Sequence, residues 1–233
     1  EAAAFASTTV AHFVEDALVP LDTLGLIQRT YLELRPEFAD DLLQQNDALL
    51  ELLRLDQRGQ VYVSAYRDEA TLAQQLTMRQ STWFARALAG ERYISEVQLT
   101  GDNALYLIVS APAPDGGVVA ARLSMNVLWD TVDSIRFGQT GTAYVIDAEG
   151  DLFAHTDRAA VINRVNMFNQ AGLSQLRAQP DMAWSGITTN LAGQSVLAAT
   201  SPVAETNWLI VTEVQEAEAF GVSRTALLLL IAI

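Results

Sequence analysis

Arg122 is the residue whose setting most clearly suggests a chemical role. Successive residues of a strand point to opposite faces, so Val118, Ala120, Arg122 and Ser124 share one face of a predicted strand. The small side chains leave room around the guanidinium, whose planar fork suits bidentate contact with a carboxylate or phosphate. The pattern predicts a site for an anionic or polar small molecule. The alternative is that Arg122 faces solvent or pairs with a surface carboxylate such as Asp102.

A predicted helix over Thr71–Ala89 carries a second group of candidates. Arg79 and Trp83 lie on one face at a four-residue step, with Phe84 beside them. The two aromatic residues fit either ordinary core packing or the wall of a pocket. The predicted ligand-binding residues of this helix and the strands after it are Arg79, Ser81, Trp83, Phe84, Tyr93, Tyr106, Ser110 and Arg122.

No set of residues typical of catalysis, a metal site or a cofactor stands out. The sequence lacks a glycine-rich phosphate loop, an HExxH pair, an EF-hand loop and a nucleophile elbow, and it has no cysteine. Asp147, Glu149 and Asp151 lie close together, but without the spacing of a calcium loop. His12 and His155 are far apart in the sequence, which favours structural roles. We predict a non-catalytic domain without metal or cofactor; a hydrolase that uses only carboxylates stays open.

The charge of the chain excludes several classes of partner. The formal net charge is −14 at pH 7, and half of the residues are hydrophobic. A nucleic-acid-binding protein or a protein that binds anionic lipid headgroups needs a basic face. The sequence therefore predicts a globular domain that binds neither.

The elements that position these residues begin with helices. Residues 1 to about 34 have apolar residues at three- and four-residue steps, which predicts one long helix, bent near Pro20 and Gly25. A second helix is predicted from Pro36 to about Arg54. A long first helix is typical of a stalk that emerges from a membrane, although a plain packing helix has the same pattern.

Two groups of strands follow. The first group begins with the strand Val61–Tyr66, and its strands Tyr93–Leu99, Leu105–Ala111 and Val118–Met125 are predicted to form an antiparallel meander that the Thr71–Ala89 helix crosses. A helix over Val127–Ile135 leads to the second group, which has a short helix around Leu173–Arg177 and the strands Thr142–Ile146, Leu152–His155, Trp184–Thr189, Ser195–Thr200 and Trp208–Val214. Similar Asp- and Gly-containing turns open both groups, which predicts two related α+β modules.

The C-terminal residues Ala226–Ile233 form an uninterrupted apolar run. The run is shorter than the ~20 apolar residues that span a bilayer. We expect it to be the start of a transmembrane helix, with a C-terminal packing helix as the alternative. We also expect a preceding segment, because the chain begins at Glu1 without a methionine.

The stretch Phe137–His155, FGQTGTAYVIDAEGDLFAH, resembles the start of the membrane-proximal module of a double Cache (dCache) domain, the extracytoplasmic sensor of many bacterial transmembrane receptors. The strands of Leu191–Val214 with Trp208, and Tyr93-Ile94-Ser95 after Trp83-Phe84, follow the order of that family. The resemblance implies an α+β fold with a long N-terminal stalk helix and two PAS-like antiparallel-sheet modules. It divides the chain into stalk and packing helices (1–55), a membrane-distal module (56–135), a membrane-proximal module (136–215) and a C-terminal helix that enters the membrane (216–233).

The resemblance also bears on the ligand. In the amino-acid-binding branch of the family, an Arg before an aromatic pair holds the ligand carboxylate, and an Asp on a later strand holds the ammonium. Trp83 and Phe84 match the aromatic pair, whereas Ser81 stands in place of that Arg and Arg122 falls near the Asp. Leu76 stands in place of a family tyrosine, and Arg79 is predicted to replace the missing arginine. Because the strand of Arg122 offers no carboxylate, the sequence argues against an α-amino acid ligand.

Taken together, the resemblance implies the periplasmic ligand-sensing domain of an inner-membrane histidine kinase, chemoreceptor or nucleotide cyclase. A small polar or anionic metabolite is expected in the distal module, and a homodimer is expected to form through the N-terminal helix. The alternative is a module that binds a partner protein or has no small-molecule ligand. A pocket lined by Trp83, Tyr93 and Arg122 favours the sensor, and a filled pocket favours the alternative.

Overall fold

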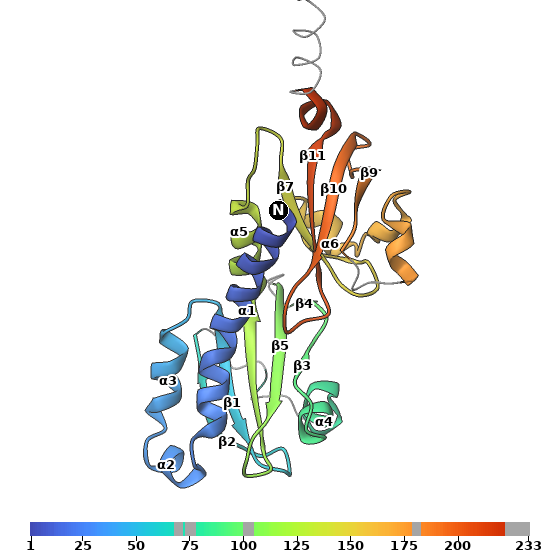
Figure 1. Cartoon of the computed structure of the whole chain (residues 1–233). Coiled ribbons are helices and arrows are strands. Elements are labelled where there is room, and N and C mark those ends of the chain that lie inside the picture. The colour runs from blue at the N-terminus through green and yellow to red at the C-terminus, as the bar shows by residue number, and fades with distance from the viewer. Residues whose placement is uncertain (68–71, 73–77, 100–104, 179–182, 222–233) are drawn as a thin grey trace, which may run out of the picture. The chain divides into compact units, whose positions relative to one another are not determined.

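The computed structural model describes residues 1–67, 72, 78–99, 105–178 and 183–221 (Figure 1). The chain divides into two compact units. The N-terminal unit is Phe13–Leu128, and the C-terminal unit combines Glu1–His12 with Trp129–Ile233. Each unit is built around its own antiparallel sheet. The start of the Thr71–Ala89 helix with Leu76 and the apolar C-terminal run lie outside the described residues.

The long first helix ends earlier than predicted. Helix α1 (Ala2–Leu26) continues through Pro20, and its Leu21 and Leu24 are fully buried. Gln28 is extended, with φ −64° and ψ 141°, and separates α1 from α2 (Arg29–Leu34). The prediction of one helix to residue 34 is therefore wrong, because α1 ends at Leu26 and a new helix begins at Arg29.

The predicted second helix is also too long. Helix α3 (Glu37–Gln44) ends before strand β1 (Leu49–Leu55), which was predicted as helix. The leucine-rich run LLELLRL suits a helix by propensity, but β1 is buried on both faces. A short run dominated by leucine does not by itself separate a buried strand from a buried helix.

The sheet of the N-terminal unit has six strands in the order β2-β1-β6-β5-β3, with β4 also paired to β5. Its other strands are β2 (Val61–Tyr66), β3 (Tyr93–Ile94), β4 (Gln98–Leu99), β5 (Leu105–Pro112) and β6 (Val118–Ser124). The predicted strands are confirmed, except that Tyr93–Leu99 splits into β3 and β4. The predicted antiparallel meander is confirmed in the order β3-β5-β6, and β1, which was predicted as helix, lies between β6 and β2.

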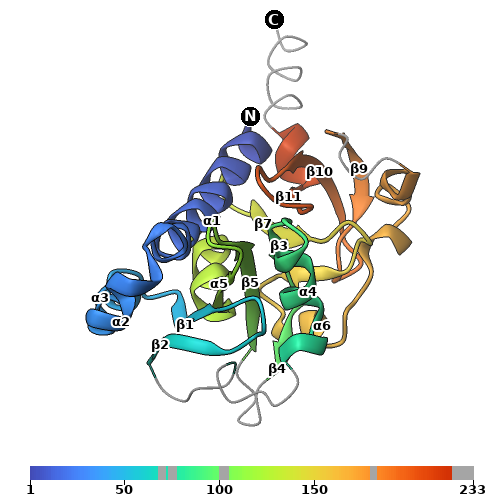
Figure 2. The ribbon, with the colours of Figure 1, turned by 90° about the horizontal axis from the view of Figure 1, so that it is seen from below.

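Helices cover this sheet on both sides. Figures 1 and 2 show α3 and α4 (Thr82–Leu88) on opposite sides of the sheet, with α3 against β1 and β2 and α4 against β5. A 3₁₀ turn, η1 (Met78–Gln80), precedes α4, so Arg79 does not lie on the same helix as Trp83. Gly90 ends α4 as predicted, with φ +93°, a conformation that glycine adopts readily.

The sheet of the C-terminal unit has five strands in the order β8-β7-β11-β10-β9. They are β7 (Thr142–Ile146), β8 (Leu152–Ala154), β9 (Ser185–Thr189), β10 (Ser195–Pro202) and β11 (Leu209–Gln215). All five strands were predicted, with small differences at their ends. The β7–β8 turn is the predicted hairpin connection: Gly150 has φ +88°, and the Asp147 carboxylate accepts hydrogen bonds from the amides of Glu149 and Asp151.

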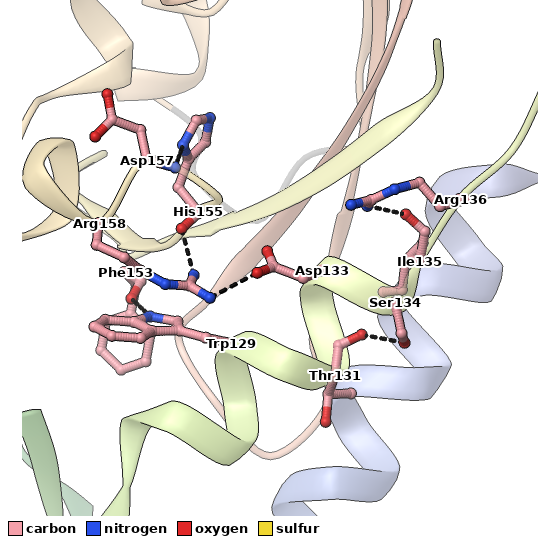
Figure 3. Close-up of polar contacts among 10 residues, drawn as sticks. All are labelled: Trp129, Thr131, Asp133, Ser134, Ile135, Arg136, Phe153, His155, Asp157 and Arg158. Atoms are coloured by element: carbon pink, nitrogen blue, oxygen red, sulfur yellow. Dashed lines mark hydrogen bonds and ion pairs between the residues drawn. The ribbon is translucent and has the colours of Figure 1, made fainter. Parts of the chain in front are cut away.

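The segment after β8 is partly helical. It contains α6 (Arg158–Ile162), η2 (Met167–Asn169) and η3 (Ser174–Ala178), and η3 lies where a short helix was predicted around Leu173–Arg177. Figure 3 shows how α5 (Met125–Ser134) is joined to it: Arg158 binds Asp133 at 2.6 Å and lies 4.3 Å from the Trp129 ring centroid, while Trp129 donates to the carbonyl of Phe153. These contacts hold α5 against the β8–α6 connection.

Residues 216–221 continue as a helix after β11. In the part of the chain that the structure describes, no helix has the length and apolar character required to cross a membrane. The predicted α+β class, with a long N-terminal helix and two antiparallel sheets, is confirmed. The proposed segments 1–55, 56–135, 136–215 and 216–233 stay a prediction.

Candidate ligand-binding site

The sheet of the N-terminal unit presents one face to α4, and four of the eight predicted site residues lie on this face: Tyr93, Tyr106, Ser110 and Arg122. We call this the inner face. The strand register places Glu51 of β1, Arg122 of β6 and Ile108 of β5 side by side in one row. The next row along the strands pairs Tyr106 with Ser124, and another pairs Ser110 with Ala120. The prediction that one face of the strand carries Val118, Ala120, Arg122 and Ser124 is therefore confirmed.

Arg122 is buried and forms an ion pair. Its side chain is 6% exposed, and its Nε lies 3.4 Å from Oε2 of Glu51, whose side chain is fully buried. Its guanidinium carbon lies 5.4 Å from the ring centroid of Tyr106, within the range of a cation–π contact. The alternative of a solvent-facing Arg122 is wrong, and Asp102 lies outside the described residues. Arg122 therefore belongs to a buried charged group.

Glu51 is the residue that the sequence analysis missed. Its carboxylate oxygens accept hydrogen bonds from the amide of Leu72 at 2.9 and 3.1 Å, in addition to facing Arg122. The predicted helix over Pro36–Arg54 concealed it, because only a strand at this position brings Glu51 into register with Arg122. The available signal was the pair of opposite charges, Glu51 and Arg54, inside a run of leucines. The strand of Arg122 offers no carboxylate, but its neighbour does.

Trp83 and Phe84 form the apolar part of the site. Both are buried in a cluster with Leu53, Met78 and Ile108 of the inner face and its cover. Their rings meet edge to face with centroids 6.0 Å apart. Within the described residues the buried Trp83 Nε1 has no hydrogen-bond partner, which is uncommon for a buried indole. Core packing is thus established for both residues, and Trp83 retains a donor for a further contact.

Tyr93, Tyr106 and Ser110 have defined positions around this cluster. Ser110 is fully buried and donates to the carbonyl of Trp83 at 2.8 Å, so it fastens α4 to β5. Tyr93 of β3 pairs with Ser110 and packs at the edge of the cluster. Tyr106 donates to Gln98 at 3.1 Å, and burial raises the pKa of its hydroxyl. Tyr106 is the one of these three that contacts Arg122.

Arg79 and Ser81 have other surroundings. Arg79 is exposed and lines, with Gln57 and Phe84, an open hollow of about 350 Å³. Ser81 precedes α4 and donates to the carbonyl of Met78. Their contacts give no support to the prediction that Arg79 replaces a ligand-binding arginine.

Arg54 provides a comparison on the opposite face of the same sheet. It is 1% exposed, contacts Asp115 at 2.9 Å, and donates to the carbonyl of Gly25 at 3.2 Å. This arginine fastens α1 to the sheet. Among the described residues, each face of the sheet thus has a buried, ion-paired arginine with a tyrosine ring nearby, Arg122 with Tyr106 and Arg54 with Tyr62.

Comparison with known proteins identifies the family. The family model for the double Cache arrangement of the Cache domain matches residues 1–223. The chain belongs to the dCache family. The resemblance seen in the sequence is thereby confirmed, and this dCache chain is a ligand-sensing domain of the extracytoplasmic kind, not a catalytic domain.

A relative and several solved structures are similar to this dCache chain. The methyl-accepting chemotaxis protein McpG of Pseudomonas putida is 26% identical over 134 residues, which are 55% of this chain and 20% of that protein. The ligand-binding domain of the chemoreceptor PctB of Pseudomonas aeruginosa, solved with L-Arg, has a TM-score of 0.68 at 19% identity and covers 94% of each chain. That of CtaA of Pseudomonas fluorescens, solved with L-alanine, has a TM-score of 0.65 at 17% identity, covering 94% of this chain and 96% of CtaA. These structural likenesses establish the fold.

Proposed function

We propose that the dCache chain binds a small zwitterionic molecule, such as an amino acid, over the inner face of the N-terminal unit. The observation that carries the proposal is the Glu51–Arg122 pair, with Nε and Oε2 3.4 Å apart and both side chains buried. A guanidinium suits a ligand carboxylate, and a carboxylate suits a ligand ammonium. A ligand with both charges complements the pair, whereas the carboxylate of Glu51 would repel a purely anionic ligand placed beside Arg122.

The aromatic residues support the same ligand class. Tyr106 lies against the guanidinium, and Trp83 offers a buried indole N–H to a polar group. Similar domains were solved with L-Arg, L-alanine and γ-aminobutyric acid (GABA), which each carry an amine and a carboxylate. The proposal keeps the predicted polar ligand and revises the argument against amino acids, which considered only the strand of Arg122.

The receptor around this domain is part of the proposal. We place the chain in the periplasm as part of an inner-membrane receptor that is anchored by helices flanking it, with 56–135 far from the membrane and 136–215 near it. The similarity to a chemotaxis protein favours a chemoreceptor over a kinase or cyclase. Ligand binding would act by stabilising one conformation of the domain over another.

A homodimer through α1 is also proposed. The exposed residues Phe5, His12, Val19 and Leu26 recur every seven residues along α1. Three of these four are large and apolar, with 69%, 61% and 72% exposure for Phe5, Val19 and Leu26. A seven-residue apolar repeat on one helix suits a second copy of the same helix.

Calorimetric titration tests the ligand class. The probes are a panel of α-amino acids and, separately, succinate and other dicarboxylates without an amine. We expect an amino acid to bind, and Arg122→Lys and Glu51→Gln each to weaken its binding about tenfold or more, since a charged hydrogen bond contributes roughly 1.5–3 kcal/mol. Saturating ligand, at a hundred times its Kd, should stabilise the domain by ~2.7 kcal/mol.

Arg54→Lys is the matched control, because it alters a buried ion pair on the opposite face of the same sheet. Binding that survives Arg54→Lys and is lost in Arg122→Lys supports the inner face. Binding of succinate but of no amino acid would overturn the zwitterion proposal. If neither panel binds, the interaction module for a partner protein becomes the better account.

A further inference from the structure

The C-terminal unit contains a cavity that the ligand site described above does not explain. Its volume is about 400 Å³, and its lining includes Thr142, His155, Asn190, Gln194 and Glu213. All of these residues belong to the C-terminal unit. Half of the lining residues carry a hydroxyl or amide group, Asp157 adds a second carboxylate, and no arginine or lysine contributes among the described residues. The described lining therefore offers polar and acidic groups and no positive side chain.

Glu213 is the buried charge of this cavity. It lies on β11 between Thr142 of β7 and Ala198 of β10, and it is 8% exposed. In the described part of the chain its Oε2 has no hydrogen-bond partner, and no salt bridge reaches the carboxylate. Burial raises its pKa to about 7, against a smaller opposing effect of a hydrogen bond from Asn190. A buried carboxyl group without a cation is costly unless a partner is supplied.

Two further polar atoms on the same face of the sheet also lack partners among the described residues. They are the hydroxyl of Tyr144 on β7 and the hydroxyl of Thr188 on β9. Tyr144 shares its face with Thr142, and the register Thr188–Val196–Gln215 puts Thr188 on that face as well. Tyr144 and Thr188 do not line the cavity, so Glu213 is the one of these three residues whose unpartnered atom belongs to the cavity lining.

The ionisable neighbours leave the negative charge of Glu213 uncompensated. The His155 ring lies 5.5 Å from the Tyr144 ring, and its Nδ1 accepts a hydrogen bond from the amide of Asp157 (Figure 3). Burial lowers the pKa of His155, so the ring is neutral near pH 7. Arg158, the nearby cation, is directed to Asp133 and to the His155 carbonyl. Asp157 itself caps α6 through a hydrogen bond from Ala160.

We propose that this cavity is a second binding site, which takes a small organic cation with a primary ammonium group. The ammonium pairs with the Glu213 carboxylate and donates to oxygen atoms of Thr142, Asn190 or Gln194. The site is built from the C-terminal unit alone, so it works independently of the Glu51–Arg122 pair. The net charge of −14 adds long-range attraction for such a ligand.

The test is calorimetric titration of the whole chain with ethanolammonium chloride and with putrescine dihydrochloride at pH 8. Ethylene glycol serves as the neutral analogue, and calcium chloride as the inorganic cation. We expect at least one ammonium compound to bind saturably and Glu213→Gln to weaken it about tenfold or more. Glu149→Gln, which removes a charge from an exposed turn of the same unit, should leave binding unchanged.

Arg122→Lys separates this proposal from the one above. Ammonium binding that persists in Arg122→Lys and is lost in Glu213→Gln supports a second site. The proposal is overturned if no ammonium compound binds, if Glu213→Gln binds as tightly as the wild type, or if Arg122→Lys abolishes binding. Binding of calcium or ethylene glycol as tight as that of the ammonium compounds would also overturn it.

Discussion

Glu51 and Arg122 show how a single residue can change the interpretation of a site. Arg122 alone suggested a positive pocket for an anion, because a guanidinium in a cleft attracts carboxylates. Glu51, 3.4 Å away on the adjacent strand, turns the same position into a site with both charges. The revised ligand class follows from this one neighbour. Glu213 presents the opposite case, a buried carboxylate without a basic partner among the described residues.

Glu213 leads to a prediction about pH. In the folded chain its pKa is raised to about 7, against 4.5 for an unperturbed glutamate. Between these values the folded state binds the extra proton, so the free energy of unfolding decreases as the pH rises from 4.5 to 7. Glutamine does not titrate, so Glu213→Gln does not lose this stability. We expect the free energy of unfolding of Glu213→Gln minus that of the wild type to be about 2 kcal/mol larger at pH 8 than at pH 5.

Urea unfolding of both proteins at pH 5 and pH 8 measures this difference. Other groups, such as His155 and Asp147, titrate in both proteins, so the comparison of wild type and variant removes most of their effect. A difference between the two proteins that is the same at both pH values would contradict a buried, uncompensated Glu213.

At the scale of elements, the last described helical turn is attached to the segment before β7 by one carboxylate. Glu218 accepts hydrogen bonds from the amides of Gln139 and Thr140 at 2.7 and 2.9 Å and from the Thr140 hydroxyl at 2.6 Å. These bonds lower the pKa of Glu218. The Thr140 hydroxyl also accepts from the amide of Gln215, at the end of β11. The helix that leaves the domain is thus joined to the entry of its sheet.

We predict that Glu218→Ala frees the amides of Gln139 and Thr140. Their hydrogen exchange should become faster by about tenfold or more, because each loses its carboxylate acceptor. Exchange in β10 should not change, and Glu216→Ala, which removes only a contact with Ser195, is the control. Unaltered exchange at both amides in Glu218→Ala would show that these contacts do not hold the helix.

The same scale shows where helix and strand preferences conflict. Two segments beside Asp- and Gly-containing turns have patterns typical of strands. One, Val61–Tyr66, alternates in side-chain character, and the other, Thr142–Ile146, is rich in β-branched and aromatic residues. They form the predicted strands β2 and β7. The run Leu49–Leu55 has no such signal, and it forms strand β1, between β2 and β6. Local preference therefore identified β2 and β7 and failed for the leucine-rich β1, whose residues also suit a helix.

At the scale of the whole molecule, the exposed stripe on α1 predicts the oligomeric state. Phe5, Val19 and Leu26 leave a large apolar area on a helix that is otherwise packed on one side. Placing a lysine in the stripe introduces charge repulsion into a symmetric helix pair. We expect the wild-type chain to dimerise at high micromolar concentration, and Val19→Lys to weaken the dimer about tenfold or more.

Sedimentation equilibrium measures this dissociation constant. Glu15→Lys, at another exposed position of α1, controls for the added charge. A wild type that stays monomeric at millimolar concentration, or a Val19→Lys variant that dimerises as well as the wild type, would contradict pairing through α1. Either result would leave the two proposed ligand sites untouched, since neither includes α1.

The sequence by itself determined the family, the α+β class, the strands with alternating patterns and the face of β6 on which Arg122 lies. These features follow from local rules, namely side-chain alternation, turn residues and the order of motifs along the chain. Only the tertiary structure decided that Leu49–Leu55 is a strand between β2 and β6, that Glu51 faces Arg122, and that Glu213 is buried beside a cavity. Strand order and burial depend on contacts between residues far apart in the chain, and no local pattern encodes which charge another strand will bring alongside.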